Sequence, residues 1–289
     1  MHINMKYYIV TIGAIFISLG IGILVGFNLN YDQELSKQQA QIIGDLDVKF
    51  EELRDKNNDL ENKLKKINTS YDKTINYINN NADKLIAEEL TDKNIGIISI
   101  NGNSNLEDIE NTITTANGNI AFNINLKVDT ISNDVLKDIS TKFGVDIKTE
   151  SDIINYLVDS LKSDDGKENL KYFEEIGLLD LNKLEEDYQS YTSVILSEES
   201  NAENLEKHFE LIDKLLIEKL KSEGKYLVGV ENTNKKTSYI ELYSDNKVAT
   251  IDNINEGSGK LALVLALKDG NVVGNFGVSK TAESLIPYK

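Results

Sequence analysis

The sequence of 289 residues contains no cysteine, only two histidines, two methionines and one proline. The lack of cysteine excludes disulfide bonds, thiolate metal sites, iron–sulfur clusters and cysteine nucleophiles. The histidines, His2 and His208, lie far apart in the sequence, so we do not expect a metal site built from several histidines of one chain. We therefore predict no metal and no other cofactor. The single proline, Pro287, leaves almost the whole chain free to form long helices.

Acidic residues outnumber basic ones by 48 to 31, which gives a formal net charge of -17. A soluble region with this charge repels phosphate backbones, so a nucleic-acid partner is not expected. The content of 40% hydrophobic and 27% charged residues is that of a folded chain rather than a disordered one.

A segment without charges runs from Tyr7 to Phe27. As a helix it is about 31 Å long, which matches the hydrocarbon core of a bilayer. We predict a single-pass transmembrane anchor at 7–27; a cleaved signal peptide is the alternative, although its apolar core is normally shorter. Lys6 precedes the segment and acidic residues follow it. Residues 1–6 are therefore expected in the cytoplasm, and the residues after about 28 on the outer side of the cell membrane.

Small residues recur at every fourth position of this anchor, at Ala14, Ser18, Gly22 and Gly26. That spacing places them on one helix face, where two backbones can approach closely. The sequence predicts a self-association face, although small residues are also common in membrane helices in general.

Residues 31–90 are polar and proline-free, and they carry a heptad repeat of mostly apolar positions. The sustained repeat predicts a coiled-coil stalk in a parallel homodimer, in which the amide Asn57 would fix the register. A helix packed on its own domain is the alternative, but it would need a wider apolar face. The predicted core consists of Ile43, Leu46, Phe50, Leu53, Asn57, Leu60, Leu64, Ile67, Tyr71 and Ile78, with Thr74 as a polar member.

Short β-branched segments alternate with helical patterns from residue 92 to 289. This alternation predicts an α/β fold: a mostly parallel, Rossmann-like sheet covered by helices on both faces. Strands are expected at 94–100, 120–128, 193–197, 226–230 and 247–251. Helices are expected at 105–116, 133–147, 150–188, 202–222 and 237–244. The apolar run 261–267 fits a buried strand or a helix, and its leucine and alanine content slightly favours a helix.

The motifs that usually carry chemistry are incomplete. Gly257-Ser258-Gly259-Lys260 resembles a phosphate-binding loop but lacks its first glycine and its Ser/Thr, and the loop after the first strand lacks G-x-G-x-x-G. A lone histidine such as His208 is usually solvated or structural. Acidic pairs such as Asp164-Asp165 and Glu185-Glu186 have no EF-hand spacing. We expect no catalytic residues and no enzyme.

Several segments resemble the mycobacterial copper transport protein B (MctB) family, which has SteB-like relatives in actinobacteria. The resemblance rests on Lys6-Tyr7-Tyr8 before a glycine-punctuated run at 20–26, the heptads, and the domain start at 94–100. Near the end it rests on the apolar run 261–267, Gly274-Asn275-Phe276-Gly277 and Leu285-Ile286-Pro287.

The resemblance implies two roles. MctB-like proteins are associated with copper transport or homeostasis, and SteB-like members with a cell-division complex containing the membrane protein SteA. This sequence lacks the soft ligands that Cu(I) prefers, since it has no cysteine and its methionines are Met1 and Met5. We therefore expect a dimeric, non-enzymatic scaffold in the envelope, with copper transport as the alternative. An enzyme acting on envelope polymers is a third hypothesis.

Overall fold

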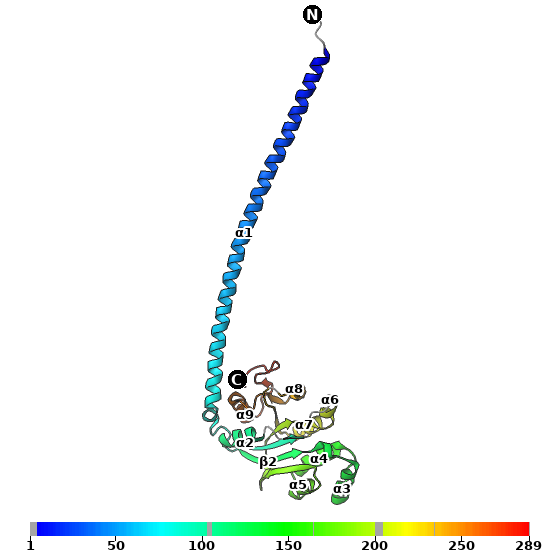
Figure 1. The fold of residues 1–289 in the computed structure, drawn as a ribbon. Coiled ribbons are helices and arrows are strands. Elements are labelled where there is room, and N and C mark those ends of the chain that lie inside the picture. Colours follow the sequence, from blue (N-terminus) through cyan, green and yellow to red (C-terminus); the bar gives the residue numbers. More distant parts are fainter. Residues whose placement is uncertain (1–4, 103–105, 164, 200–204, 234, 289) are drawn as a thin grey trace. The chain divides into compact units, whose positions relative to one another are not determined.

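The computed structural model describes residues 5–102, 106–163, 165–199, 205–233 and 235–288, with the backbone alone at 29–33 (Figure 1). Contacts within the chain divide it into two units, Met1–Asp72 and Lys73–Lys289. Most of the predicted cytoplasmic tail, residues 1–4, lies outside the described residues.

The first unit consists of helix α1, which spans Met5–Ile86 and so continues into the second unit. Its segment Met5–Asn28 is long and apolar enough to cross a membrane, and none of its most apolar window is buried. Side chains from 34 to 72 are exposed as well. The predicted anchor and most of the predicted heptad core therefore lie on one helix, and their apolar side chains are exposed.

The second unit is built on one seven-stranded sheet with the order β3-β2-β1-β4-β5-β6-β7. All neighbouring strands are parallel except β2 and β3, which are antiparallel. Every residue of β1 after the first is buried, as expected for a parallel strand covered on both faces. The strands are β1 (Asn94–Ile100), β2 (Asn119–Leu126), β3 (Leu179–Leu184), β4 (Ser193–Glu198), β5 (Tyr226–Val230), β6 (Ala249–Ile251) and β7 (Asn275–Phe276).

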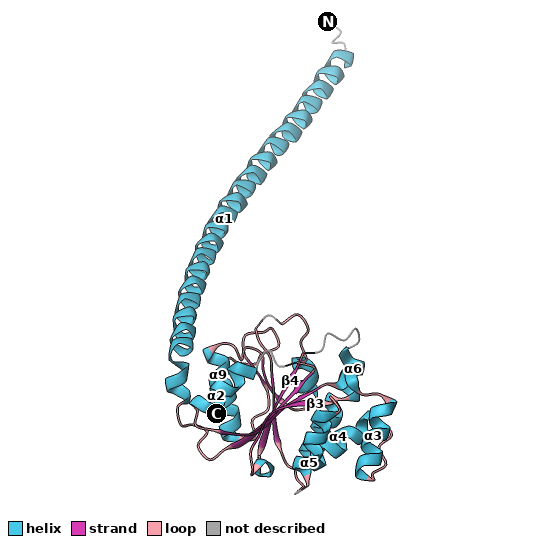
Figure 2. Cartoon of the chain, turned by 60° about the horizontal axis from the view of Figure 1, so that its bottom comes forward, coloured by secondary structure: helices cyan, strands magenta, loops and turns pink. Residues whose placement is uncertain are grey.

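Helices cover both faces of the sheet, and each face has its own apolar cluster (Figure 2). One cluster contains residues of α2, α9 and the end of α1, and the other contains residues of α3 to α8. The helices are α2 (Leu106–Thr115), α3 (Asn133–Phe143), α4 (Glu150–Ser160), α5 (Gly166–Glu175), α6 (Leu205–Leu211), α7 (Asp213–Ser222), α8 (Ile240–Asp245) and α9 (Gly257–Asp269), with 3₁₀ turns at Val128–Thr130 and Tyr188–Ser190.

The last turns of α1 are part of the second unit and pack against α9. Ala82 and Ile86 are buried, and the side-chain oxygen of Asn79 accepts a hydrogen bond of 2.8 Å from the amide of Ser258. The helix N-cap residue of α9, Glu256, makes no side-chain capping bond, so Asn79 supplies an acceptor to this helix start. A Cβ on Gly257 would lie 2.5 Å from the Cα of Asn79, so only glycine allows this approach. The glycine at position 257 is therefore explained by the packing of α9 against α1.

The structure confirms a mixed α/β domain with a mostly parallel sheet, and the run 261–267 is helical within α9. The expectation of helix throughout 150–188 is wrong, because Gly177, at φ 75°, ends the helical region and β3 follows. The helix expected at 202–222 is broken at Ile212, and its first residues, 202–204, lie outside the described residues. Strand β7 is too short to leave a pattern in the sequence.

Candidate functional site

The carboxyl ends of the parallel strands form the region where a site is expected. From β1 the chain continues to β2 on one side of the sheet, and from β4 it continues to β5 on the other side. The strand order therefore reverses between β1 and β4. In open α/β sheets, ligands bind outside the carboxyl ends of strands at such a switch point. Asn101 directly follows β1 here, and Glu198 is the last residue of β4.

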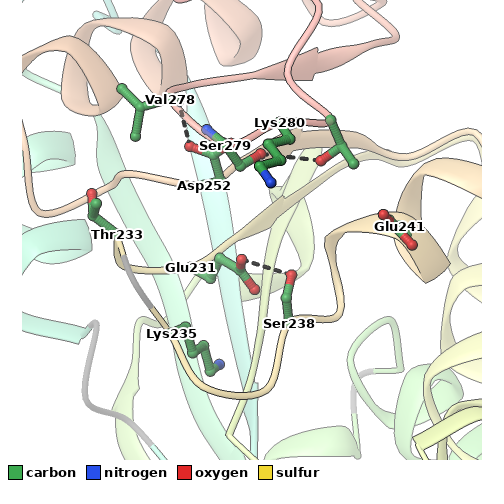
Figure 3. Close-up of a pocket in the computed structure, with 10 residues that line it drawn as sticks. Glu231, Thr233, Lys235, Ser238, Glu241, Asp252, Val278, Ser279 and Lys280 are labelled. Atoms are coloured by element: carbon green, nitrogen blue, oxygen red, sulfur yellow. Dashed lines mark hydrogen bonds between the residues drawn. The ribbon is translucent and has the colours of Figure 1, made fainter.

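A polar cleft of about 480 Å³ lies at the ends of β5, β6 and β7 (Figure 3). Glu231 and Asp252, which directly follow β5 and β6, line it together with Lys235, Ser238 and Lys280.

Asp252 holds the chain that follows β7. Its two carboxylate oxygens accept hydrogen bonds from the backbone amides of Val278 at 2.7 Å and Ser279 at 3.0 Å. A Cβ on Gly277, at φ 135°, would lie 1.9 Å from Oδ1 of this carboxylate, so the position requires glycine. Asp252 is 4% exposed and acts as a structural anchor of the loop.

Glu231 is also held by its surroundings, since Ser238 donates a hydrogen bond of 2.8 Å to Oε1 and the Tyr239 amide donates one of 3.4 Å to Oε2. Burial raises the pKa of Glu231, and the bond from Ser238 opposes that shift. The two buried acidic groups of the cleft, Glu231 and Asp252, therefore stabilise neighbouring loops, whereas Glu241 lines the cleft as an exposed carboxylate.

Lys235 connects the cleft with a second polar cluster. Its ammonium group donates a hydrogen bond to the backbone carbonyl of Glu198. Glu198, His208 and Asp213 each offer one ligand atom within 4.8 Å of the others, and Glu198 and Asp213 are each 1% exposed. We call these three residues the switch-point cluster, because Glu198 ends β4 beside β1.

Neighbouring side chains fix the orientation of this cluster. Tyr243 donates a hydrogen bond of 2.8 Å to Oδ1 of Asp213, while Oδ2 of Asp213 lies 3.8 Å from Nδ1 of His208. The other ring nitrogen of His208 lies 3.5 Å from the side-chain nitrogen of Asn101. Burial raises the pKa of Asp213 and lowers that of His208, so each charged form is disfavoured by burial.

Two hydroxyl groups that line the cleft are held by carboxylates. Ser238 and Thr233 donate their hydroxyl groups to Glu231 and Glu256, and His208 contacts Asn101 and Asp213 rather than a hydroxyl. Of the acidic pairs, Asp164 lies outside the described residues.

The residues predicted for self-association lie along α1. Ala14, Ser18, Gly22 and Gly26 are exposed, and a Cβ on either glycine would meet no atom within 4 Å. The heptad positions from Ile43 to Tyr71 are exposed, whereas Ile78 is half-buried at the part of α1 that belongs to the second unit. The predicted contact residues of the first unit are thus exposed.

Comparison with known protein families gives a match over residues 2–287, nearly the whole chain, to the family described as copper transport outer membrane protein, MctB. The chain belongs to the MctB family. This confirms the family inferred from the sequence segments, and it supports an envelope protein related to copper transport at the level of the family. A comparison with curated proteins found no match.

Sequence reasoning missed the switch-point cluster. His208 was interpreted as a lone histidine because its two acidic neighbours are ten and five residues away in sequence, on a strand end and a helix start. One residue of the cluster left a signal: Glu198 ends an apolar strand, where an acidic residue marks the carboxyl edge of a sheet. Asp213 gave no such signal. Its side chain is buried because the helix breaks at Ile212 and a new helix, α7, begins at Asp213.

Proposed function

We propose that this MctB-family protein is a single-pass, membrane-anchored scaffold of the envelope, paired through α1 as a parallel homodimer. Its α/β domains lie beyond the membrane and bind a partner without catalysing a reaction. The SteB-like resemblance points to a SteA-like membrane protein and a role in cell division.

The observation that carries the proposal is a row of exposed apolar side chains on α1. They recur with heptad spacing, and each is between 52% and 63% exposed. Leaving so much apolar surface in water is unfavourable, at about 25 cal/mol per Å². The row consists of Ile43, Leu46, Phe50, Leu53, Leu60, Leu64, Ile67 and Tyr71.

A second copy of the chain suits this row better than the chain's own domain. The row is confined to two heptad positions, which is the width of a coiled-coil seam and narrower than a face packed on a globular domain. Asn57 lies within it at a position where a paired amide favours two parallel strands. Anchors in one bilayer would give both helices the same direction, and the segment Met5–Asn28 can serve as that anchor.

The absence of an enzymatic role is supported by the cleft. Asp252 and Glu231, its buried acids, are both engaged by backbone amides. A general base or nucleophile needs a group that can reach substrate in the right protonation state.

The chain's lack of cysteine makes the pairing directly testable. Leu60→Cys, at a core position, should form a disulfide-linked dimer when membranes holding the full chain are oxidised, because paired core positions bring Cα atoms within about 7 Å. Asn62→Cys, on the outer face of the same turn, is the matched control and should remain largely monomeric. Equal cross-linking of both variants, or of neither, would overturn the parallel pair.

Copper homeostasis is a second candidate function, favoured by the family and by the nitrogen and oxygen ligands of the switch-point cluster. It predicts that cells lacking the protein change in copper sensitivity and recover when it is restored. Unchanged growth across copper concentrations would count against this function and leave the scaffold unaffected.

A further inference from the structure

We propose that Glu198, His208 and Asp213 form a binding site for one divalent transition-metal ion at the carboxyl edge of the sheet. The inference goes beyond the paired scaffold and does not depend on it. It starts from three residues that separate elements bring together: the end of β4, helix α6 and the first residue of α7.

The spacing of the three groups suits a shared ion. Their ligand atoms all lie within 4.8 Å of one another. Nitrogen and oxygen ligands bind such ions at about 2.0–2.2 Å, so two ligands of one ion lie at most about 4.4 Å apart. Small side-chain rotations therefore bring all three into one coordination sphere.

Asp213 provides an independent observation. Its carboxylate is 1% exposed, and its Oδ2 atom has no hydrogen-bond partner although Oδ1 is held by Tyr243. The facing Nδ1 atom of His208 is also buried without a hydrogen bond. Leaving buried polar atoms unmatched costs about 1–3 kcal/mol each, and a cation between Oδ2 and Nδ1 would satisfy both.

The surroundings resemble the outer shell of a metal site. Tyr243 fixes the carboxylate of Asp213 through Oδ1, while Oδ2 lies 3.8 Å from Nδ1 of His208, and Asn101 lies beside the second ring nitrogen of His208. Such partners orient ligands in metalloproteins. The positive charge of Lys235 acts on Asp213, and its ammonium group donates a hydrogen bond to the backbone carbonyl of Glu198.

The ligand types define the class of ion. One imidazole and two carboxylates suit Zn²⁺, Mn²⁺, Fe²⁺ or Cu²⁺, whereas Cu⁺ prefers sulfur ligands. The cluster lies at the switch point of the sheet, which is where α/β folds place ligand sites.

The test uses the full chain in detergent micelles, purified without a histidine tag and carrying His2→Gln, so that His208 is the sole histidine. Cu²⁺, Zn²⁺ and Mn²⁺ are titrated separately by calorimetry, and the Cu²⁺ sample is examined by pulsed electron paramagnetic resonance. We expect one ion per chain for at least one metal and, for Cu²⁺, coupling to the nitrogens of a single imidazole.

Two variants test the ligands and one controls for charge. His208→Gln and Asp213→Asn should each weaken binding at least about tenfold, on the scale of lost metal-site contacts. Glu206→Gln removes the same charge as Asp213→Asn from an exposed position on α6 and should leave the affinity within about twofold. Thermal unfolding without metal establishes that each variant is folded.

No binding of any of the three ions, unchanged affinity in both ligand variants, or an equal loss in Glu206→Gln would overturn the site. These outcomes are separate from those for the scaffold, because pairing is measured by cross-linking at Leu60→Cys, outside the α/β domain.

Discussion

Asn79 shows how one side chain joins two elements. The triplet 79–81 interrupts the apolar pattern of α1 in the sequence, yet in the structure Asn79 hydrogen bonds to the first turn of α9. The interruption therefore marks the place where the helix changes from an exposed apolar row to contact with its own domain.

Asn79→Ala should destabilise the second unit by about 1 kcal/mol, the usual cost of losing a helix-capping acceptor. Hydrogen exchange at the start of α9 measures the loss directly and should be faster at Ser258. Asn80→Ala is the control, because Asn80 is exposed in the next position. Equal effects of the two substitutions would contradict the capping role.

Asp152 gives a prediction that depends on pH. In the capping box at the start of α4, its carboxylate accepts bonds from the Lys148 and Thr149 amides, and these lower its pKa from the ordinary 3.8. A lowered pKa contributes stability above 3.8 that is lost as the pH falls through the folded-state value. Asp152→Asn should thus destabilise by about 1 kcal/mol or less at pH 7, with a difference that shrinks in acid.

Urea unfolding of Asp152→Asn and of the parent, compared at each pH, checks this direction. Glu150→Gln serves as the control for removing an acidic group from the same helix turn, since Glu150 is exposed. A destabilisation that grows towards low pH would refute the assignment.

Within α1, Asn57 is the polar position of the apolar row. Asn57→Leu should make the pair more stable but less specific in register, because a buried amide restricts alignment at some cost in stability. Leu53→Cys and Leu60→Cys chains produced together report the register. Cross-links between positions 53 and 60 should increase with Asn57→Leu and stay rare with Asn58→Leu, a change beside the row.

The elements that the sequence predicted best are those with strong local patterns. Strand β1 matches its apolar run, and the leucine-rich run 261–267 lies within α9. Strand β3 was missed because its short alternation follows two acidic helices, and its antiparallel pairing with β2 depends on distant residues. The break at Ile212 depends on tertiary contacts of Asp213.

For the whole molecule, the sequence led to the family and to the α/β class, but the switch-point cluster could not be predicted. The cluster depends on the sheet order, which brings β4 beside β1 across almost one hundred residues of chain. The heptads predict a partner for α1, and the apolar side chains of that row are exposed in the structure.

The attachment of the last strand has a consequence for biosynthesis. Strand β7 is an edge strand of the sheet, and Asp252 accepts hydrogen bonds from the backbone amides of Val278 and Ser279, which come shortly after it. Until the ribosome has added residues 275–279, the outer side of β6 has no neighbour and remains an open template for other extended chains. A chain truncated shortly after α9 would therefore lack this neighbouring strand and be prone to aggregate.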